Sequence, residues 1–129
     1  MKKLLIDTQS FIWFMEGNTY LPTVIRTLMS DSLCQCTISM ACLWEITIKA
    51  SLSKLAISTD IATMINDAQK NGFELLAIEP VHLVTLSTLE LIHRDPFDRI
   101  MIAQAITEDM PIVTSDNVFE QYPVKRLWK

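Results

Sequence analysis

Four acidic residues, far apart in the chain, stand where a parallel α/β protein gathers its ligands. Asp7 and Asp116 each follow a short apolar run that predicts a strand. Glu45 and Asp98 lie in the first two turns of predicted helices, which start at the same edge as the strand ends. Ligands of open parallel sheets bind beyond the carboxyl ends of the strands, so these four side chains are expected to converge.

Converging carboxylates favour a metal site. They repel one another, and their pKa values rise unless a cation lies between them. Mg²⁺, with Mn²⁺ as a common substitute, takes oxygen ligands and is usually held by one or two carboxylates together with substrate phosphate. Such an ion can activate water for attack on a phosphodiester. The reaction class that this pattern predicts is metal-assisted phosphoester hydrolysis.

Each acid also has an ordinary structural interpretation. Asp7 and Asp116 could form turns, and Glu45 could pair with Lys49 four residues on in a helix. Asp98 could interact with the dipole of its own helix. Taken singly these local roles are the commoner ones, but four of them at one edge of a sheet favour a site.

The stretch from His93 to Arg99 shows how one acid is positioned. Asp95 is expected to cap a helix in which Pro96 is the first residue, because Asp accepts from free first-turn amides and Pro has none to donate. The apolar positions that follow go nearly all round this helix, which predicts that it is buried. Asp98 therefore stands among apolar neighbours, where an unpartnered carboxylate is costly.

The elements that must position these acids alternate along the chain. Apolar runs predict strands over 3–6, 33–38, 73–78 and 111–115, with an edge strand over 124–128. One helix is predicted to end near Gly17, and others to run from Pro22 to Ser30 and from Pro80 to Leu89. Two more are predicted behind caps, from Met40 to Ser51 after Ser39 and from Thr59 or Asp60 to Asn71. A last helix is predicted to start at Pro96. This alternation predicts an α/β fold, a three-layer α/β/α sandwich with a mainly parallel central sheet.

Composition limits the class of protein. The 129 residues, half of them apolar, predict one domain over 1–129. Three cysteines within nine positions cannot all pair, which indicates a reducing cytosol; Cys34, Cys36 and Cys42 have no partners at zinc-ligand spacing. The start Met1-Lys2-Lys3 lacks a signal-peptide core and no run reaches transmembrane length, so a cytoplasmic protein that does not span a membrane is expected.

Charge and glycine content exclude other classes. The net charge of −4 argues against nucleic-acid binding by bulk electrostatics, so such a role needs metal ions or a local basic patch. Lys49, Lys54, Arg94 and Arg99 could form a small basic rim for RNA, although solvated charges explain them equally well. With only two glycines, the chain cannot build the glycine-rich loop of a P-loop or Rossmann protein.

Four motifs occur in the order of a known family. They are Leu5-Ile6-Asp7-Thr8, Leu43-Trp44-Glu45-Ile46 with Lys49, His93 to Arg99 with Ile102-Ala103-Gln104-Ala105, and Val113-Thr114-Ser115-Asp116. Together they resemble the PIN-domain nucleases over nearly the whole chain. More narrowly, they resemble the toxin ribonucleases of bacterial toxin–antitoxin pairs, the virulence-associated protein C type.

The resemblance implies a Mg²⁺- or Mn²⁺-dependent endoribonuclease on an α/β/α sandwich, with RNA as substrate. It also implies a homodimer that a small cognate antitoxin inhibits by inserting near the acidic site. The family's catalytic quartet falls on Asp7, Glu45, Asp98 and Asp116. Within the quartet, Asp7 and Asp98 are implied as the metal ligands, Glu45 and Asp116 as completing the pocket. Thr114 is implied to hold a water or ligand.

Several residues leave alternatives open. Gln9 stands where many relatives carry His, which puts a substrate role of that position in doubt. A catalytically silent PIN-like module that only holds a protein or RNA partner is an alternative. A phosphatase or a phospho-receiver domain is less favoured, because this chain lacks the second acids that those classes require. His82 has an ordinary surface or packing explanation, and no special role is expected for it or for His93 in its loop, although His93 and Arg94 could touch phosphate near the site. Trp13, Phe14 and Met15 are either core or part of an interface.

Overall fold

The structure, a computed structural model, describes residues 2–129; Met1, part of the basic start, lies outside them. The strands of this part of the chain are β1 (Lys2–Ile6), β2 (Cys34–Ser39), β3 (Glu74–Leu76), β4 (Ile112–Val113) and β5 (Arg126–Leu127). The helices are α1 (Thr8–Glu16), α2 (Thr23–Ser30), α3 (Met40–Ser51), α4 (Ile61–Lys70), α5 (Pro80–Thr88) and α6 (Pro96–Glu108), with a short 3-10 helix η1 (Asn117–Gln121).

The five strands form one parallel sheet in the order β3-β2-β1-β4-β5. Strand β1 lies in the middle, and its consecutive residues Leu4, Leu5 and Ile6 are fully buried, as expected for a strand covered on both faces. The chain moves outward from β1 in one direction through β2 and β3, then returns to the other side of β1 with β4. The strand order therefore reverses between β1 and β4, where ligands of such sheets bind.

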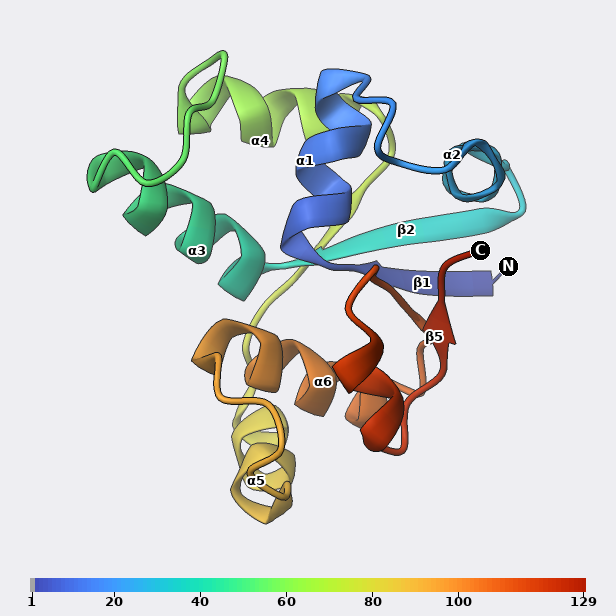
Figure 1. Cartoon of the computed structure of the whole chain (residues 1–129), viewed down its shortest axis with the longest axis vertical. Coiled ribbons are helices and arrows are strands. Elements are labelled where there is room, and N and C mark those ends of the chain that lie inside the picture. Colours follow the sequence, from blue (N-terminus) through green and yellow to red (C-terminus); the bar gives the residue numbers. More distant parts are fainter. Residues whose placement is uncertain (1) are drawn as a thin grey trace.

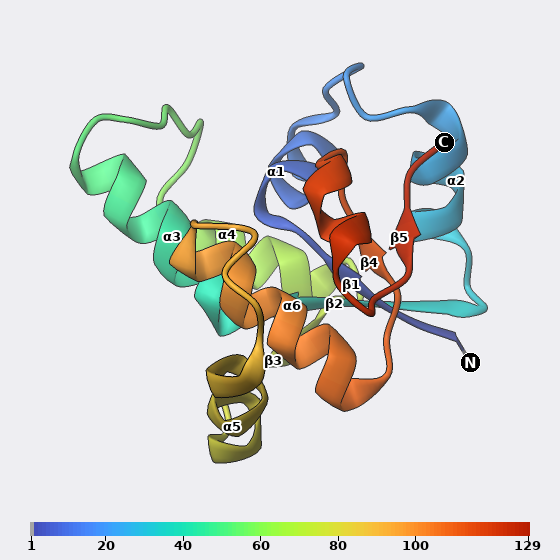
Figure 2. The ribbon, with the colours of Figure 1, turned by 60° about the horizontal axis from the view of Figure 1, so that its bottom comes forward.

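Helices cover both faces of the sheet, which confirms the predicted three-layer α/β/α fold. Helices α1, α2 and α4 lie on one side of β1 and β2, and α5 and α6 lie on the other (Figure 1). Helix α3 continues from the carboxyl end of β2 and contacts both α1 and α6. Figure 2 shows the start of α6 beside α3, so two helices meet at the same edge of the sheet.

Helix boundaries follow the predicted caps. Asp95 Oδ1 accepts from the backbone N–H groups of Phe97 and Asp98, and Ser39 and Asp60 cap α3 and α4. Gly17 ends α1 in the left-handed conformation at φ 65°, which glycine adopts without steric cost. These helices begin and end where they do because short polar side chains satisfy the free amides of the first turn.

Several predicted elements differ in extent from those of the structure; the strands predicted over 111–115 and 124–128, for example, are Ile112–Val113 and Arg126–Leu127. Strand β3 stops at Leu76 because its pairing with β2 ends at Ser39, where the partner turns into α3. Helix α6, for which only the start was predicted, ends at Glu108, and Asp109 after it adopts the left-handed conformation. The 3-10 helix after β4 was not predicted; the Asp116 side chain caps its first turn.

The aromatic cluster of α1 belongs to the core. Trp13, Phe14 and Met15 are partly buried and pack against the buried cluster. The Phe14 ring meets Phe73 edge to face with centroids 5.7 Å apart, and Trp13 packs on Trp128. All three side chains therefore pack within the chain, and each keeps part of its surface exposed.

Two further findings concern sequence-based expectations. Cys34, Cys36 and Cys42 are all free thiols. Within residues 2–129, no helix is long and apolar enough to cross a membrane.

Candidate metal centre

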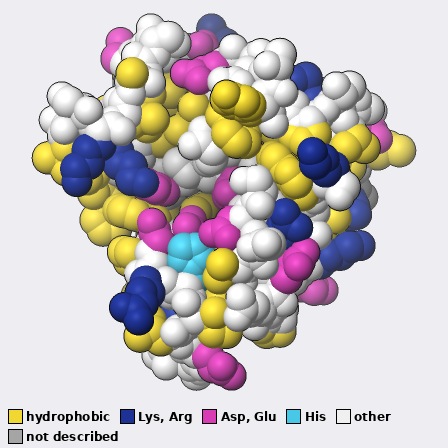
Figure 3. Space-filling view, viewed as in Figure 1, with side chains coloured by type: hydrophobic (Ala, Val, Ile, Leu, Met, Phe, Trp, Pro, Cys, Tyr) yellow, Lys and Arg dark blue, Asp and Glu magenta, His cyan; other side chains and the backbone are white. Residues whose placement is uncertain are grey.

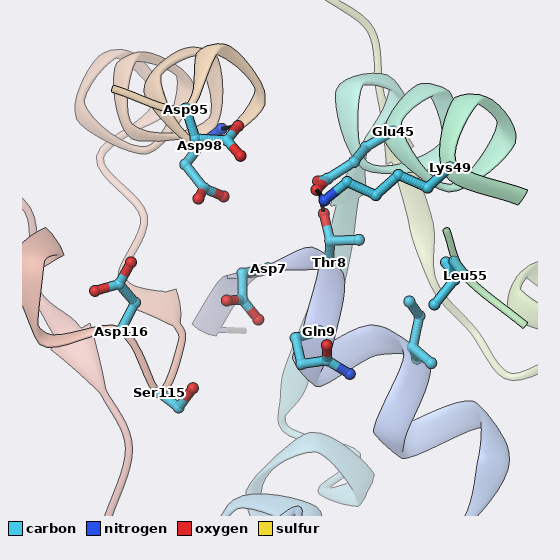
Figure 4. A pocket seen from close by; sticks show the side chains of 11 residues that line it. Asp7, Thr8, Gln9, Glu45, Lys49, Leu55, Asp95, Asp98, Ser115 and Asp116 are labelled. Atoms are coloured by element: carbon cyan, nitrogen blue, oxygen red, sulfur yellow. Dashed lines mark hydrogen bonds and ion pairs between the residues drawn. The ribbon is translucent and has the colours of Figure 1, made fainter. Parts of the chain in front are cut away.

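The four predicted acids line one pocket of about 270 Å³ at the carboxyl edge of the sheet (Figure 4). Asp7 follows β1, Glu45 lies on α3, Asp98 lies in the first turn of α6, and Asp116 follows β4. The space-filling view shows acidic side chains gathered around a hollow with a histidine among them (Figure 3). The pocket wall is completed by Thr8, Gln9, Ile12, Lys49, Leu55, Asp95 and Ser115.

Asp7 lies at the point where the strand order reverses, and both of its oxygens are held. Oδ1 accepts from the N–H of Ser10 at 2.9 Å and caps α1, and Oδ2 accepts from the Thr114 hydroxyl at 2.6 Å. The side chain is almost completely buried. Burial raises the pKa of Asp7 above its ordinary value, and the nearby charge of Glu45 adds to this, against the lowering effect of the hydrogen bonds from Ser10 and Thr114.

Glu45 faces the same pocket from α3 and is also held at both oxygens. Oε1 accepts from the Thr8 hydroxyl at 2.6 Å, and Oε2 pairs with Lys49 four residues on. The hydrogen bond to Glu45 raises the pKa of Lys49. The predicted helix pair with Lys49 is confirmed, yet the carboxylate still lines the pocket. A local structural role and a place in the site are therefore compatible.

Asp98 lies in the first turn of α6 with 23% of its side chain exposed. Asp95 supplies the cap of α6, as predicted, so Asp98 is not needed for that purpose. Burial is the largest cause that raises the pKa of Asp98, the negative charges of Asp95, Glu45 and Asp7 raise it as well, and His93 lowers it; together these effects give a pKa of about 7. A carboxyl with so high a pKa in a pocket of other acids is a typical sign of a functional site.

Asp116 connects the pocket to a histidine for which no special role was expected. Asp116 Oδ1 accepts from the Val118 N–H at 3.0 Å, and Oδ2 lies 2.9 Å from His93 Nε2. The same nitrogen lies 3.1 Å from Asp98 Oδ2. His93 therefore contacts two acids of the pocket, which its place in the loop two residues before the cap of α6 did not specify. His82, by contrast, is fully buried and contacts Glu108, as a packing role predicts.

The predicted basic rim is only partly formed. Arg99 donates to the carbonyl oxygen of Glu90 at 2.9 Å and approaches the Tyr122 hydroxyl, so it holds the loop before α6. Lys49 lines the pocket but pairs with Glu45. Lys54 and Arg94 are exposed. The Thr114 hydroxyl donates to Asp7 and accepts from the Asp116 N–H.

The donor set fits a hard divalent cation. Carboxylate oxygens of Asp98 and Asp116 lie within 4.8 Å of each other and of a ring nitrogen of His93, and Asp7 lines the same pocket (Figure 4). Burial is the main cause that raises the pKa of Asp7 and of Asp98, and the negative charges of neighbouring acids add to it. A bound Mg²⁺ or Mn²⁺ would supply a compensating positive charge, because carboxylate oxygens are its preferred protein ligands.

Fold and pocket together define a class: a parallel α/β protein with a cluster of carboxylates at the switch point of its sheet. The chain belongs to the PIN domain family, whose sequence model matches residues 4–125. The resemblance carried by the four motifs is thereby confirmed at the level of the family. A search of curated proteins found no match.

Solved structures with the same fold include toxin–antitoxin complexes. A chain of VapBC2 from Rickettsia felis bound to a DNA fragment from their promoter superposes with a TM-score of 0.74 at 15% identity, covering 98% of this chain and 99% of that one. DNA-bound VapBC from Salmonella typhimurium gives 0.68 at 18% identity over 98% of each chain. A toxin-antitoxin complex from Klebsiella pneumoniae gives 0.64 at 17% identity, covering 93% of this chain and 92% of that one. At these identities the likeness establishes the fold.

Proposed function

We propose that this chain is a metal-dependent endoribonuclease and acts as the toxin of a toxin–antitoxin pair. The observation that carries the proposal is the meeting of four carboxylates from separate segments in one pocket. Carboxylates that repel one another are costly for the fold unless a cation lies between them, and the charges of neighbouring acids contribute, after burial, to the raised pKa of Asp98. A metal ion and a substrate phosphate bound in the pocket would offset this cost.

Each acid has a separate role in the proposed site. Asp7 and Asp98 are the metal ligands, and Glu45 and Asp116 complete the pocket. The bound ion supplies activation of water and stabilisation of the charge that develops on the phosphodiester. Thr114 and the Ser10 amide orient the Asp7 carboxylate, so that its geometry is fixed before metal binds.

RNA as substrate and the role as a toxin rest on family membership and on likeness to the toxin-antitoxin complexes. The partner of such a toxin is a small cognate antitoxin. The DNA bound in the solved complexes is a ligand of those complexes and is not proposed as a ligand of this chain. The net charge of −4 makes binding of RNA dependent on the metal ion rather than on a broad basic surface.

A homodimer is part of the proposal. An apolar groove supports a protein contact on the face formed by α3, α5 and α6. Trp44 and Leu83 on this face are each more than half exposed. The groove is lined by Trp44, Ile78, Leu83, Leu86, Pro96, Phe97 and Ile100. Light scattering across a range of protein concentrations tests the dimer, and a constant monomer mass would contradict it.

The decisive experiment measures cleavage of a fluorescent single-stranded RNA by the purified chain. Cleavage is expected with Mg²⁺ or Mn²⁺ and not with a chelator, and Asp7→Asn and Asp98→Asn should abolish it. Asp109→Asn is the matched control, because it removes the same charge at the opposite end of α6, where Asn tolerates the left-handed conformation.

Two results would count against the proposal. Undiminished cleavage by Asp98→Asn would refute the metal-ligand assignment. Calorimetry that detects no divalent-metal binding, in a protein that also fails to cut RNA, would favour the alternative of a silent PIN-like module that only holds a partner.

A further inference from the structure

We propose that His93 is a positioning residue of this site: through its Nε2–H, the neutral imidazole holds the carboxylates of Asp98 and Asp116 in place for the metal. The inference rests on the proposed metal-dependent function and goes beyond the acidic quartet. His93 touches the two acids but is not assigned a contact with substrate.

The contacts place one N–H between two carboxylates. His93 Nε2 hydrogen-bonds Asp116 Oδ2 at 2.9 Å, and Asp98 Oδ2 lies close enough, at 3.1 Å, to be attracted by the same proton. The two acids come from different elements, the first turn of α6 and the residue after β4. The ring therefore bridges two carboxylates from separate elements that would otherwise repel each other.

The opposite ring nitrogen fixes which one carries the proton. The backbone N–H of Asp95 donates to His93 Nδ1 at 3.1 Å, so Nδ1 must be an acceptor. In a neutral imidazole the proton is then on Nε2, the atom that faces Asp98 and Asp116. Coordination of a metal through Nε2 would require this proton to be on Nδ1 instead, where it would face the donating N–H of Asp95. His93 is thus a donor to the metal ligands rather than a ligand itself.

The loop that carries His93 is built to hold the ring in this place. The Tyr122 hydroxyl accepts from the N–H groups of His93 and Ile92 at 2.8 and 3.0 Å and donates to the Glu90 carbonyl oxygen at 2.8 Å. The buried Phe119 ring meets the imidazole edge to face with centroids 5.5 Å apart. Backbone, ring face and both ring nitrogens of His93 are therefore all engaged.

The arrangement has a consequence for metal binding. His93 engages Oδ2 of each carboxylate, so Oδ1 of Asp98 remains for a metal ion. Removing a hydrogen-bond partner of metal ligands usually lowers metal affinity or activity by about 10- to 100-fold, because the ligands lose their orientation. Loss of the His93 donor should fall in this range.

Two substitutions separate the two ring nitrogens. In His93→Gln the amide nitrogen can occupy the place of Nε2 and keep the donor, but the acceptor for Asp95 is lost. In His93→Asn the amide oxygen can occupy the place of Nδ1 and keep the bond from Asp95, but the donor to the acids is lost. We expect Mn²⁺ affinity, measured by calorimetry, to fall by about tenfold or more in His93→Asn and to stay within about threefold of wild type in His93→Gln. Equal affinities in all three proteins would refute the positioning role.

Spectroscopy tests the same role without cleavage or metal loading. The chain has only two histidines, so long-range ¹H–¹⁵N spectra of the metal-free protein at about pH 8 report the tautomers of both, and His93→Asn assigns the signals. We expect the Nε2–H form at His93; the Nδ1–H form would overturn the inference. In the Mn²⁺-loaded protein, electron spin-echo modulation from a directly bound imidazole nitrogen would overturn it as well.

These measurements distinguish the inference from the proposed function. If wild type neither binds Mn²⁺ nor cuts RNA, the proposed function fails and the positioning role for a metal fails with it, whatever the tautomer. If wild type cuts RNA and His93→Asn cuts it at the same rate, only the inference about His93 fails. Equal far-UV circular dichroism of wild type and His93→Asn excludes misfolding as the cause of a loss.

Discussion

Replacing Asp98 by Asn should stabilise the metal-free protein even though it removes a proposed metal ligand. Burial and the charges of nearby acids raise the pKa of Asp98 from 3.8 to about 7. A carboxyl whose pKa is raised in the folded state favours folding when it is protonated, and this contribution is lost as the pH rises through the folded-state value. Above about pH 7 the ionised Asp98 therefore lowers the free energy of unfolding, whereas Asn carries no charge there.

The magnitude follows from the pKa difference. A shift of about 3 units corresponds to roughly 4 kcal/mol at 1.36 kcal/mol per unit. We expect Asn to recover about half of this, roughly 2 kcal/mol, because 23% of the Asp98 side chain is exposed and water screens its charge. The gain should be complete at about pH 8, shrink as the pH falls below 7, and vanish below about pH 4, where Asp98 is protonated in both states.

Urea unfolding in a chelator, followed by far-UV circular dichroism at several pH values, measures this gain. Asp109→Asn is the control at the other end of α6 and should change stability by only a few tenths of a kcal/mol. With Mn²⁺ at about 100 times its dissociation constant, wild type and the control should gain about 2.7 kcal/mol and Asp98→Asn little. A metal-free Asp98→Asn that is no more stable than wild type at about pH 8, or a gain independent of pH, would refute the reasoning.

Three further outcomes follow from the same geometry. Because Asp98 must be ionised to hold a cation and its pKa is about 7, Mn²⁺ affinity and RNA cleavage should fall as the pH is lowered from about 8 to 6; calorimetry that shows a flat response would contradict this. Thr114→Val removes the hydroxyl that donates to Asp7 and should raise the pKa of Asp7 further and weaken Mn²⁺ binding about tenfold; unchanged affinity would show that this hydrogen bond does not orient the ligand. Asp95→Ala removes the cap of α6 and should cost about 1 kcal/mol in urea unfolding, in contrast to Asp95→Asn, which keeps a capping oxygen.

Much of the fold can be read from local signals in the sequence. The caps at Ser39, Asp60 and Asp95 and the left-handed Gly17 mark helix ends because they satisfy backbone groups within a few residues. The continuous apolar run of β1 predicts a strand buried on both faces. The end of β3 was misjudged because it depends on where its neighbour β2 stops, which no local pattern contains.

For the site, the sequence by itself determined which acids stand at strand ends and helix starts, and parallel topology then brings them to one edge. It could not determine their partners, because Thr114 reaches Asp7 across 107 positions of the chain and Thr8 reaches Glu45 across 37. His93 was missed for the same reason: its role depends on Asp116, on Tyr122 and on the direction of one backbone N–H. Local chemistry places a carboxylate at the edge of the sheet; only the tertiary structure decides which donor faces each of its oxygens, because hydrogen bonds between distant segments form only once those segments are packed together.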